Sequence, residues 1–170
     1  MYCRDLLFMT PLGAIISNMA NNSRKDEILY AQRTLKENNI PILRTIEGKG
    51  RFEGADALWV NENLVVVGVG NRTNNEAYLQ IKNVLQKLNV DCIMLPSYQT
   101  KTQHLLGTVQ FVDKDLVLVR HEITDKAVIN FLEENKYNIV YIPENPEVTE
   151  NQAMNIVTVA PRKIIMTADC

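Results

Sequence analysis

The sequence predicts an α/β fold made of repeated units, each with a hairpin of two strands, a helix and one further strand. The underlying pattern is two short apolar runs joined by a polar turn, then a helix-length segment, then another apolar run. It occurs three times, and successive copies begin roughly fifty residues apart, a period typical of repeat architectures. Stacked units of this kind bury their apolar faces against one another.

The first copy occupies the N-terminal part of the chain. Apolar runs at residues 6–9 and 14–16 flank a turn and predict a hairpin. A helix is expected over about residues 23–37, because Ser23 is a favourable N-cap and acidic residues follow it. The apolar run at residues 41–43 is expected to form the closing strand.

The second and third copies repeat this order. The second helix is expected over about residues 75–88, and the third is expected to begin after the capping residue Thr124. The predicted strands of these two copies lie at residues 57–60, 64–67, 91–95, 109–112, 116–119 and 138–142.

A fourth copy begins with a hairpin over residues 155–159 and 164–166, after which the sequence ends. An array that stops within a unit leaves an apolar strand face uncovered. We therefore expect that the rest of this unit is missing or that another chain supplies it. The chain is interpreted as one partial domain whose units span about residues 1–46, 47–96, 97–143 and 144–170.

Composition and charge exclude several classes of function. With 170 residues, 46% of them hydrophobic, the chain suits one core and not two domains. The net charge is −2 and basic residues are scattered among acidic ones, so nucleic-acid binding is not expected. No apolar run is long enough to span a membrane, and no signal peptide is visible. Residues 68–70 lack the third glycine of a dinucleotide fingerprint, which argues against a nucleotide-binding domain.

The cysteines and histidines do not suggest a disulfide or metal framework. Cys3, Cys92 and Cys170 form no CxxC pair, so we expect a reducing, cytoplasmic location. His104 and His121 lie far apart without ligand-like neighbours. Neither a metal nor another cofactor is predicted.

Two unit boundaries carry candidates for chemistry. His104 precedes an apolar strand, where a loop can hold an imidazole at a cleft. Glu53 and Asp56 bracket two small residues just before another strand. Each also has an ordinary interpretation, as a structural histidine or as a polar turn. The functional interpretation is favoured because both sites fall at equivalent boundaries of the repeat, where side chains can converge.

Four short segments, at residues 4–6, 52–56, 71–74 and 103–105, resemble in this order the motifs of amidinotransferases, dimethylarginine dimethylaminohydrolases and arginine deiminases. One such segment is a weak signal, but four in order on a matching repeat are a strong one. The resemblance covers the whole chain and points to the guanidino-group-modifying superfamily. It implies a pentein-type α/β propeller of five ββαβ blades around a central channel, of which this chain would hold about three and a half.

The resemblance also implies roles for individual residues. In the superfamily a cysteine thiolate attacks the guanidinium carbon, an amine leaves, and the carbon passes to another amine or to water. His104 would be the general acid and base, and Glu53 the carboxylate that orients it and supports its charged form. Asp5 would bind the substrate guanidinium through paired N–H donors.

Three further residues would contact the substrate. Arg72 and Arg24 correspond to arginines that hold its α-carboxylate, and Asp56 belongs to the same motif as Glu53. Solvated positions are the ordinary alternatives, at the start of a strand for Asp5 and in the first turn of a helix for Arg24.

The sequence departs from the superfamily pattern at two places. Some members carry a second aspartate two residues after the histidine, and Leu106 stands there, which argues against a close arginine deiminase. The nucleophilic cysteine of the superfamily lies near the end of the last blade, and neither Cys3, Cys92 nor Cys170 stands in a matching place.

The leading hypothesis is an amidinotransferase-like enzyme acting on arginine or a related compound through a Cys-His-Glu site, with no turnover expected from this chain alone. The alternative is a non-catalytic propeller module that binds a guanidino ligand or a protein partner, as the ribosome anti-association factor does on the same general fold. The sequence does not distinguish among arginine, methylated arginines, agmatine or another amidino donor as the substrate, nor between an amine and water as the acceptor. As further partners we consider a homo-oligomer or a separate C-terminal segment at the uncovered strand edge.

Overall fold

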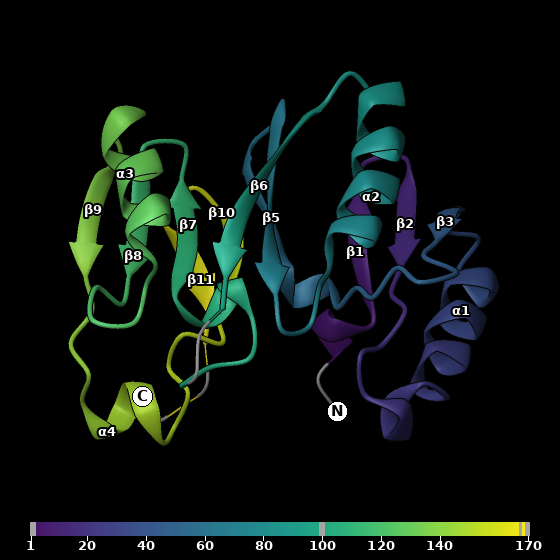
Figure 1. Ribbon diagram of the computed structural model, residues 1–170, viewed down its shortest axis with the longest axis horizontal. Coiled ribbons are helices and arrows are strands. Elements are labelled where there is room, and N and C mark those ends of the chain that lie inside the picture. Colours follow the sequence, from purple (N-terminus) through teal and green to yellow (C-terminus); the bar gives the residue numbers. More distant parts are fainter. Residues whose placement is uncertain (1–2, 99–100, 167, 169–170) are drawn as a thin grey trace.

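The computed structural model describes residues 3–98, 101–166 and 168, and it has an α/β architecture of several small sheets (Figure 1). Three sheets contain three strands each, and a fourth is a two-stranded hairpin. In each three-stranded sheet the first two strands are antiparallel, and the third is parallel to the second. A helix connects each parallel pair, so the ββαβ order expected from the sequence is confirmed for the described residues, whereas the limits of the units stay a prediction.

The elements are short. The strands are β1 (Leu7–Thr10), β2 (Gly13–Ile16), β3 (Ile42–Thr45), β4 (Ala57–Asn61), β5 (Leu64–Gly70), β6 (Asp91–Ser97), β7 (Val109–Asp113), β8 (Leu116–Val119), β9 (Asn138–Tyr141), β10 (Val157–Ala160) and β11 (Lys163–Ile165). The α-helices are α1 (Glu27–Glu37), α2 (Asn75–Lys87), α3 (Lys126–Glu134) and α4 (Pro146–Thr149). Four 3-10 helices are η1 (Cys3–Asp5), η2 (Asn22–Arg24), η3 (Gly54–Asp56) and η4 (Leu105–Gly107). In the described part of the chain, no helix has the length and apolarity needed to cross a bilayer.

The core lies between neighbouring sheets, and helices fill the space between them (Figure 1). One cluster joins the first and second sheets through Ile15, Val65 and Ile81, the last from α2. A second cluster joins the second and third sheets through Val66 and, from α3, Leu132. Val65 and Val66 are consecutive residues of β5, and their side chains point to opposite faces of the sheet. Because both faces are covered, β5 reads as a continuous apolar run.

Capping explains where the structure differs from the expected helix limits. Ser23 is not the N-cap of α1, because Asn21 accepts a hydrogen bond from the Ser23 backbone N–H at 3.0 Å and forms a 3-10 turn there. The helix α1 then begins at Glu27. Asp125, not Thr124, caps α3, since its carboxylate accepts from the backbone N–H two residues later at 2.8 Å. The hydroxyl of Thr124 instead donates to a carbonyl four residues earlier, at 2.7 Å.

The fourth hairpin forms as expected, but a short helix precedes it. β10 and β11 pair antiparallel, and the hairpin lies against β7 (Figure 1). The Thr158 hydroxyl donates to the Phe111 carbonyl at 2.9 Å, and Arg162 forms an ion pair with Asp113 at 2.8 Å. Apolar side chains of this hairpin are exposed, and Ile165 is 62% exposed.

The starts of the units pack together at their 3-10 helices. A Cβ atom added to Gly54 of η3 would lie 2.1 Å from the Leu7 carbonyl oxygen and 2.5 Å from that of Arg4. Only glycine permits so close an approach of two backbones. This contact brings η1 against η3 and places their neighbouring side chains in one small region.

Candidate active site

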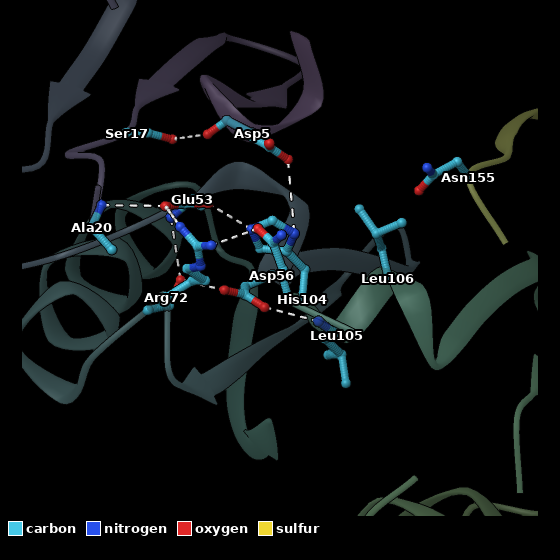
Figure 2. A network of polar contacts seen from close by, with 12 residues as sticks. Asp5, Ser17, Ala20, Glu53, Asp56, Arg72, His104, Leu105, Leu106 and Asn155 are labelled. Atoms are coloured by element: carbon cyan, nitrogen blue, oxygen red, sulfur yellow. Dashed lines mark hydrogen bonds and ion pairs between the residues drawn. The ribbon is translucent and has the colours of Figure 1, made fainter. Parts of the chain in front are cut away.

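The residues expected to form the site come from three successive unit starts and meet there (Figure 2). Asp5 is the last residue of η1, whereas Glu53 and His104 immediately precede η3 and η4. The backbone of both Glu53 and His104 is extended, and a 3-10 turn follows each. Repetition of the same local geometry brings side chains that are distant in sequence to one place.

The imidazole of His104 lies between two carboxylates. Its Nε2 atom is 2.6 Å from Oε2 of Glu53, and its Nδ1 atom is 3.9 Å from Oδ1 of Asp5 (Figure 2). Glu53 is fully buried, and His104 is 9% exposed. Each ring nitrogen therefore faces an acceptor, which is the environment that suits a protonated imidazole.

The electrostatics of the pair follow from this geometry. Burial favours the neutral imidazole, but the hydrogen bond to Glu53 and the charges of Asp56, Asp5 and Glu53 outweigh it and raise the pKa of His104 above 6.5. Burial likewise opposes ionisation of Glu53. The hydrogen bond from His104 and the charges of His104 and Arg72 overcome this effect and lower the pKa of Glu53 below 4.5.

Further donors hold the Glu53 carboxylate in place. Its Oε1 atom accepts from the Ala20 backbone N–H at 3.2 Å and from Arg72 at 3.4 Å. The backbone N–H of Glu53 donates to the hydroxyl of Thr73 at 3.3 Å. Both the side chain and the backbone at this position are thus fixed before any ligand binds.

Asp56 lies beneath the site and supports it. It is 1% exposed and does not line the cavity described below. Its carboxylate accepts from the Thr73 hydroxyl at 2.7 Å and from the Leu105 backbone N–H at 2.8 Å. Burial raises the pKa of Asp56 to about 6. These contacts link η3 to the turn after His104, so the position of Asp56 favours support of the site over the substrate contact expected from its motif.

The two arginines differ in how far their donors are occupied. Arg24 donates to Asp5 at 2.6 Å from one terminal nitrogen, while its other two nitrogens bind Glu27 at 2.9 Å each. All three nitrogens of Arg24 therefore have carboxylate partners. Arg72 donates to Gln103 at 2.7 Å and makes only the longer contact with Glu53.

A cavity of about 420 Å³ opens beside these groups. One side is formed by the residues of the site, and the other by α4 and the segment that follows it. Its lining consists of Asp5, Asn21, Arg24, Arg72, Lys101, Thr102, Gln103, His104, Leu106, Gly107, Arg120, Val148, Thr149, Gln152, Met154 and Asn155. Figure 2 shows Leu106 and Asn155 beyond His104, on the side away from Glu53.

Asp5, Glu53 and His104 could also hold a cation, because one ligand atom from each lies within 4.8 Å of the others. The sequence indicated no such cluster, because these three residues lie about fifty positions apart along the chain. Two of these ligand groups are already engaged, Nε2 of His104 by Glu53 and Asp5 by Arg24. The arrangement therefore fits proton transfer and guanidinium binding better than metal binding.

Residues 1–131 match the sequence model of one family, described as arginine deiminase. The chain belongs to the arginine deiminase family. The resemblance to the guanidino-group-modifying superfamily drawn from the four motifs is thereby confirmed.

Solved structures of similar fold agree with this membership. The dimethylarginine dimethylaminohydrolase of Pseudomonas aeruginosa, a cysteine-to-serine mutant in complex with citrulline, is 25% identical with a TM-score of 0.80 and matches 98% of this chain. The amidinotransferase SxtG of Microseira wollei is 15% identical with a TM-score of 0.78 over 96% of this chain. These matches confirm the pentein-type α/β propeller fold.

A further relative is an uncharacterized protein of Aeropyrum pernix, 22% identical over 91% of this chain. The chain spans 53% of that protein, 60% of the Pseudomonas enzyme and 57% of SxtG. The chain thus corresponds to somewhat more than half of the length of these members of the fold.

Leu106 is buried and lines the cavity, at the position where some members of the superfamily carry a second aspartate. Of the cysteines, Cys3 is exposed and Cys92 is buried, and neither lines the cavity; Cys170 lies outside the described residues.

Sequence reasoning missed the residues that support the site. Thr73 stands inside one of the four motifs, and its place there was the available signal. Gln103 also stands inside one of the four motifs, at residues 103–105, whereas Ala20 acts through its backbone and had no distinguishing side-chain pattern. Ser17, whose hydroxyl donates to the Asp5 carbonyl at 2.6 Å, likewise gave no signal in the sequence.

Proposed function

We propose that this chain carries the guanidinium-binding and proton-transfer groups of a site that modifies the guanidino group of arginine or a related compound. The observation that carries the proposal is the 2.6 Å contact between His104 and the buried Glu53, beside Asp5 and open to a cavity. A buried carboxylate paired with an imidazole is how a site holds a proton near neutral pH.

His104 would act first as the acid and then as the base. Because its pKa is raised, His104 holds a proton more readily than an ordinary histidine and can give that proton to the amine that leaves the guanidinium carbon. The neutral imidazole would then accept a proton from the incoming water or amine. Glu53 remains ionised throughout and stabilises the charged imidazole.

Asp5 would bind the guanidinium and Arg72 the α-carboxylate. A carboxylate and a planar guanidinium match in geometry, and Arg24 already donates one hydrogen bond to Asp5 at 2.6 Å. Substrate must therefore share Asp5 with Arg24 or displace it. Arg72 is the better anchor for a carboxylate, since it lines the cavity and the nitrogens of Arg24 already have partners.

No cysteine of the described residues is suited to be the nucleophile. Burial raises the pKa of Cys92 to about 12, so its thiol stays protonated. Cys3 is exposed and stands outside the cavity lining. We therefore expect this chain alone to bind guanidino compounds without turning them over.

The cavity wall also favours a substituted guanidino group. Leu106, Val148 and Met154 contribute apolar side chains to the lining. A free NH₂ group that faced them would lack an acceptor, which costs about 1–3 kcal/mol, whereas an alkyl group would be buried favourably. Among the candidate substrates, methylated arginine is accordingly expected to bind more tightly than arginine.

Calorimetry and product analysis test the proposal together. Arginine, agmatine and methylated arginine are titrated into the wild-type chain and into the Asp5→Asn variant, and ornithine, citrulline and ammonia are measured after incubation. We expect binding without product, and weaker binding by about tenfold or more in Asp5→Asn, since a charge-assisted pair is lost. Asp91→Asn, an exposed carboxylate at the start of β6, serves as the matched control.

Four outcomes bear on the proposal. If none of the guanidino compounds binds, the proposal is wrong. Release of product, abolished by His104→Ala, would show that the chain alone is a catalyst and that the nucleophile lies within it. Binding with no product supports the proposal and agrees with two kinds of protein, an enzyme that needs a further segment and a non-catalytic binding module. Restoration of turnover by an added cysteine-bearing segment would favour the enzyme.

A further inference from the structure

The wall of the cavity opposite His104 comes from a separate part of the chain. α4 and the residues after it supply Val148, Thr149, Gln152, Met154 and Asn155 to the lining. In Figure 1, α4 lies apart from the sheets, below α3. A segment with so little regular structure needs fixed contacts to keep a constant distance from His104.

Two buried polar side chains of the third sheet supply those contacts. Arg120, which follows β8 and is 5% exposed, donates to the carboxylate of Glu144 at 2.7 and 2.6 Å and to the Gly107 carbonyl at 3.1 Å. Gln110 of β7 is 3% exposed, and its amide donates to the carbonyls of Leu106 at 3.0 Å and Met154 at 2.9 Å. Each side chain thus joins η4, the turn that follows His104, to residues 144–155, which carry this wall of the cavity and are called the wall segment below.

The geometry points to Arg120 as a positioning residue that holds the wall segment and the turn after His104 in register. The inference rests on the proposed function, because it concerns the same cavity. Although Arg120 lines the cavity, its nitrogens are occupied by Glu144 and Gly107, so it is not an anchor for a ligand carboxylate.

The bond from Arg120 to Gly107 reaches His104 through one further hydrogen bond. The Gly107 backbone N–H donates to the His104 carbonyl at 3.1 Å, and the neighbouring Leu105 N–H is held by Asp56. The turn is therefore fixed from both sides, by Asp56 beneath it and by Arg120 beside it. A planar bidentate fork gives this fixation a direction that a lysine ammonium does not provide.

The test compares Arg120→Lys and Glu144→Gln with the wild type. The first variant keeps the charge and loses the fork, and the second keeps the shape of the partner and loses its charge. Arg162→Lys is the matched control, because this exposed arginine pairs with Asp113 of the same sheet, and it lies outside the lining of the cavity. Three quantities are measured: thermal unfolding, the ring ¹⁵N shifts and titration midpoint of His104 by NMR, and the Kd for the guanidino compound that the wild type binds best.

We expect both variants to shift the His104 ring signals and to move its titration midpoint, which is set by Glu53, Asp5 and Asp56 around it, toward that of an ordinary histidine. Their Kd should rise by about tenfold or more, because small displacements in a preorganised site have large effects. Arg162→Lys should leave the His104 signals and the Kd unchanged.

Unchanged His104 signals in folded Arg120→Lys and Glu144→Gln, with only a lower melting temperature, would overturn the inference and leave Arg120 a purely structural residue. If the wild type binds no guanidino compound, the proposed function fails. The His104 signals then still decide whether Arg120 positions the turn, so the two failures are distinguishable.

Discussion

At the scale of single residues, Glu53 shows how one buried carboxylate organises a site. It is fully buried, yet it accepts bonds from His104, Ala20 and Arg72, so its negative charge is compensated on each side. A buried charge is tolerated in a protein only with such partners. The same compensation keeps the proton on His104, which lies 2.6 Å away.

The Glu53→Gln variant tests this electrostatic coupling. A glutamine keeps the shape of the side chain but removes its charge, so the imidazolium loses its nearest compensating group. We expect the pKa of His104 to fall, because burial, which favours the neutral ring, then meets weaker opposition. The pKa is measured by NMR titration of the ring resonances of His104.

Glu37→Gln provides the control, because this exposed glutamate pairs with Arg33 on α1 and does not line the cavity. It should leave the His104 titration unchanged. A His104 titration that is identical in Glu53→Gln and the wild type would mean that the 2.6 Å contact does not set the protonation of the ring.

At the scale of elements, the site depends on how closely the 3-10 helices approach one another. Gly54 opens η3, one residue after Glu53, and the backbone of η1 passes directly over it. The carbonyl oxygens it would meet belong to backbone, which cannot rotate away as a side chain can. The spacing of Asp5 and Glu53 is therefore set by a single missing Cβ atom.

The Gly54→Ala variant is expected to lower the free energy of unfolding by about 2–3 kcal/mol, the upper part of the usual range for overpacking, because the clash is with backbone atoms. It should also weaken ligand binding, because relief of the clash separates η1 from η3. Chemical denaturation and calorimetry measure the two effects.

Gly48→Ala is the comparison, since the φ of +64° at this position is strained for alanine but no atom of the described residues lies within 4 Å of the added Cβ. It should cost about 1–2 kcal/mol and leave binding unchanged. Equal effects of the two substitutions on stability and binding would contradict the argument from close approach.

Helices and strands with a strong periodic pattern of apolar residues could be predicted from the sequence. Short helices and the exact starts of helices could not. The ββαβ order followed from apolar runs and helix-length segments, because burial on both faces of β5 and along α2 imposes them. The helix α4 has four residues, which is too short for a periodic pattern. The start of α1 was misplaced because Asn21 caps a 3-10 turn that contains Ser23, so α1 begins only at Glu27.

The candidate site could be predicted in part for a similar reason. Asp5, Glu53 and His104 stand at equivalent unit boundaries, so their convergence follows from the repeat. The partners of Arg24 were not predictable, because they depend on how η2 places Arg24 beside Asp5 and on the start of α1, which places Glu27 beside Arg24. The burial of Asp56 depends on how η3 and η4 pack, which no local pattern reports.

At the scale of the whole molecule, stability and the site share the same titrating groups. The raised pKa of His104 contributes stability that is fully present below 6.5 and is lost as pH rises through its folded value. The lowered pKa of Glu53 contributes stability present above 4.5, which is lost as pH falls through its folded value. Asp56, whose pKa is raised from 3.8 to about 6, contributes stability that declines between those two values as pH rises.

The free energy of unfolding is therefore expected to decrease as pH rises above 6.5, since the contribution of His104 is lost there and the end of the Asp56 titration acts in the same direction, while the contribution of Glu53 no longer changes. In Glu53→Gln this decrease should be smaller, because the folded pKa of His104 lies closer to its ordinary value. The measurement is urea denaturation at constant ionic strength from about pH 5 to about pH 9.

The chain has only two histidines, so His121→Gln removes the other one, an exposed ring that packs on Tyr141. This variant should keep the full decrease of the wild type. A decrease that persists unaltered in Glu53→Gln but disappears in His121→Gln would show that His121, and not His104, causes it. The stability of the fold would then not depend on the charge of the site.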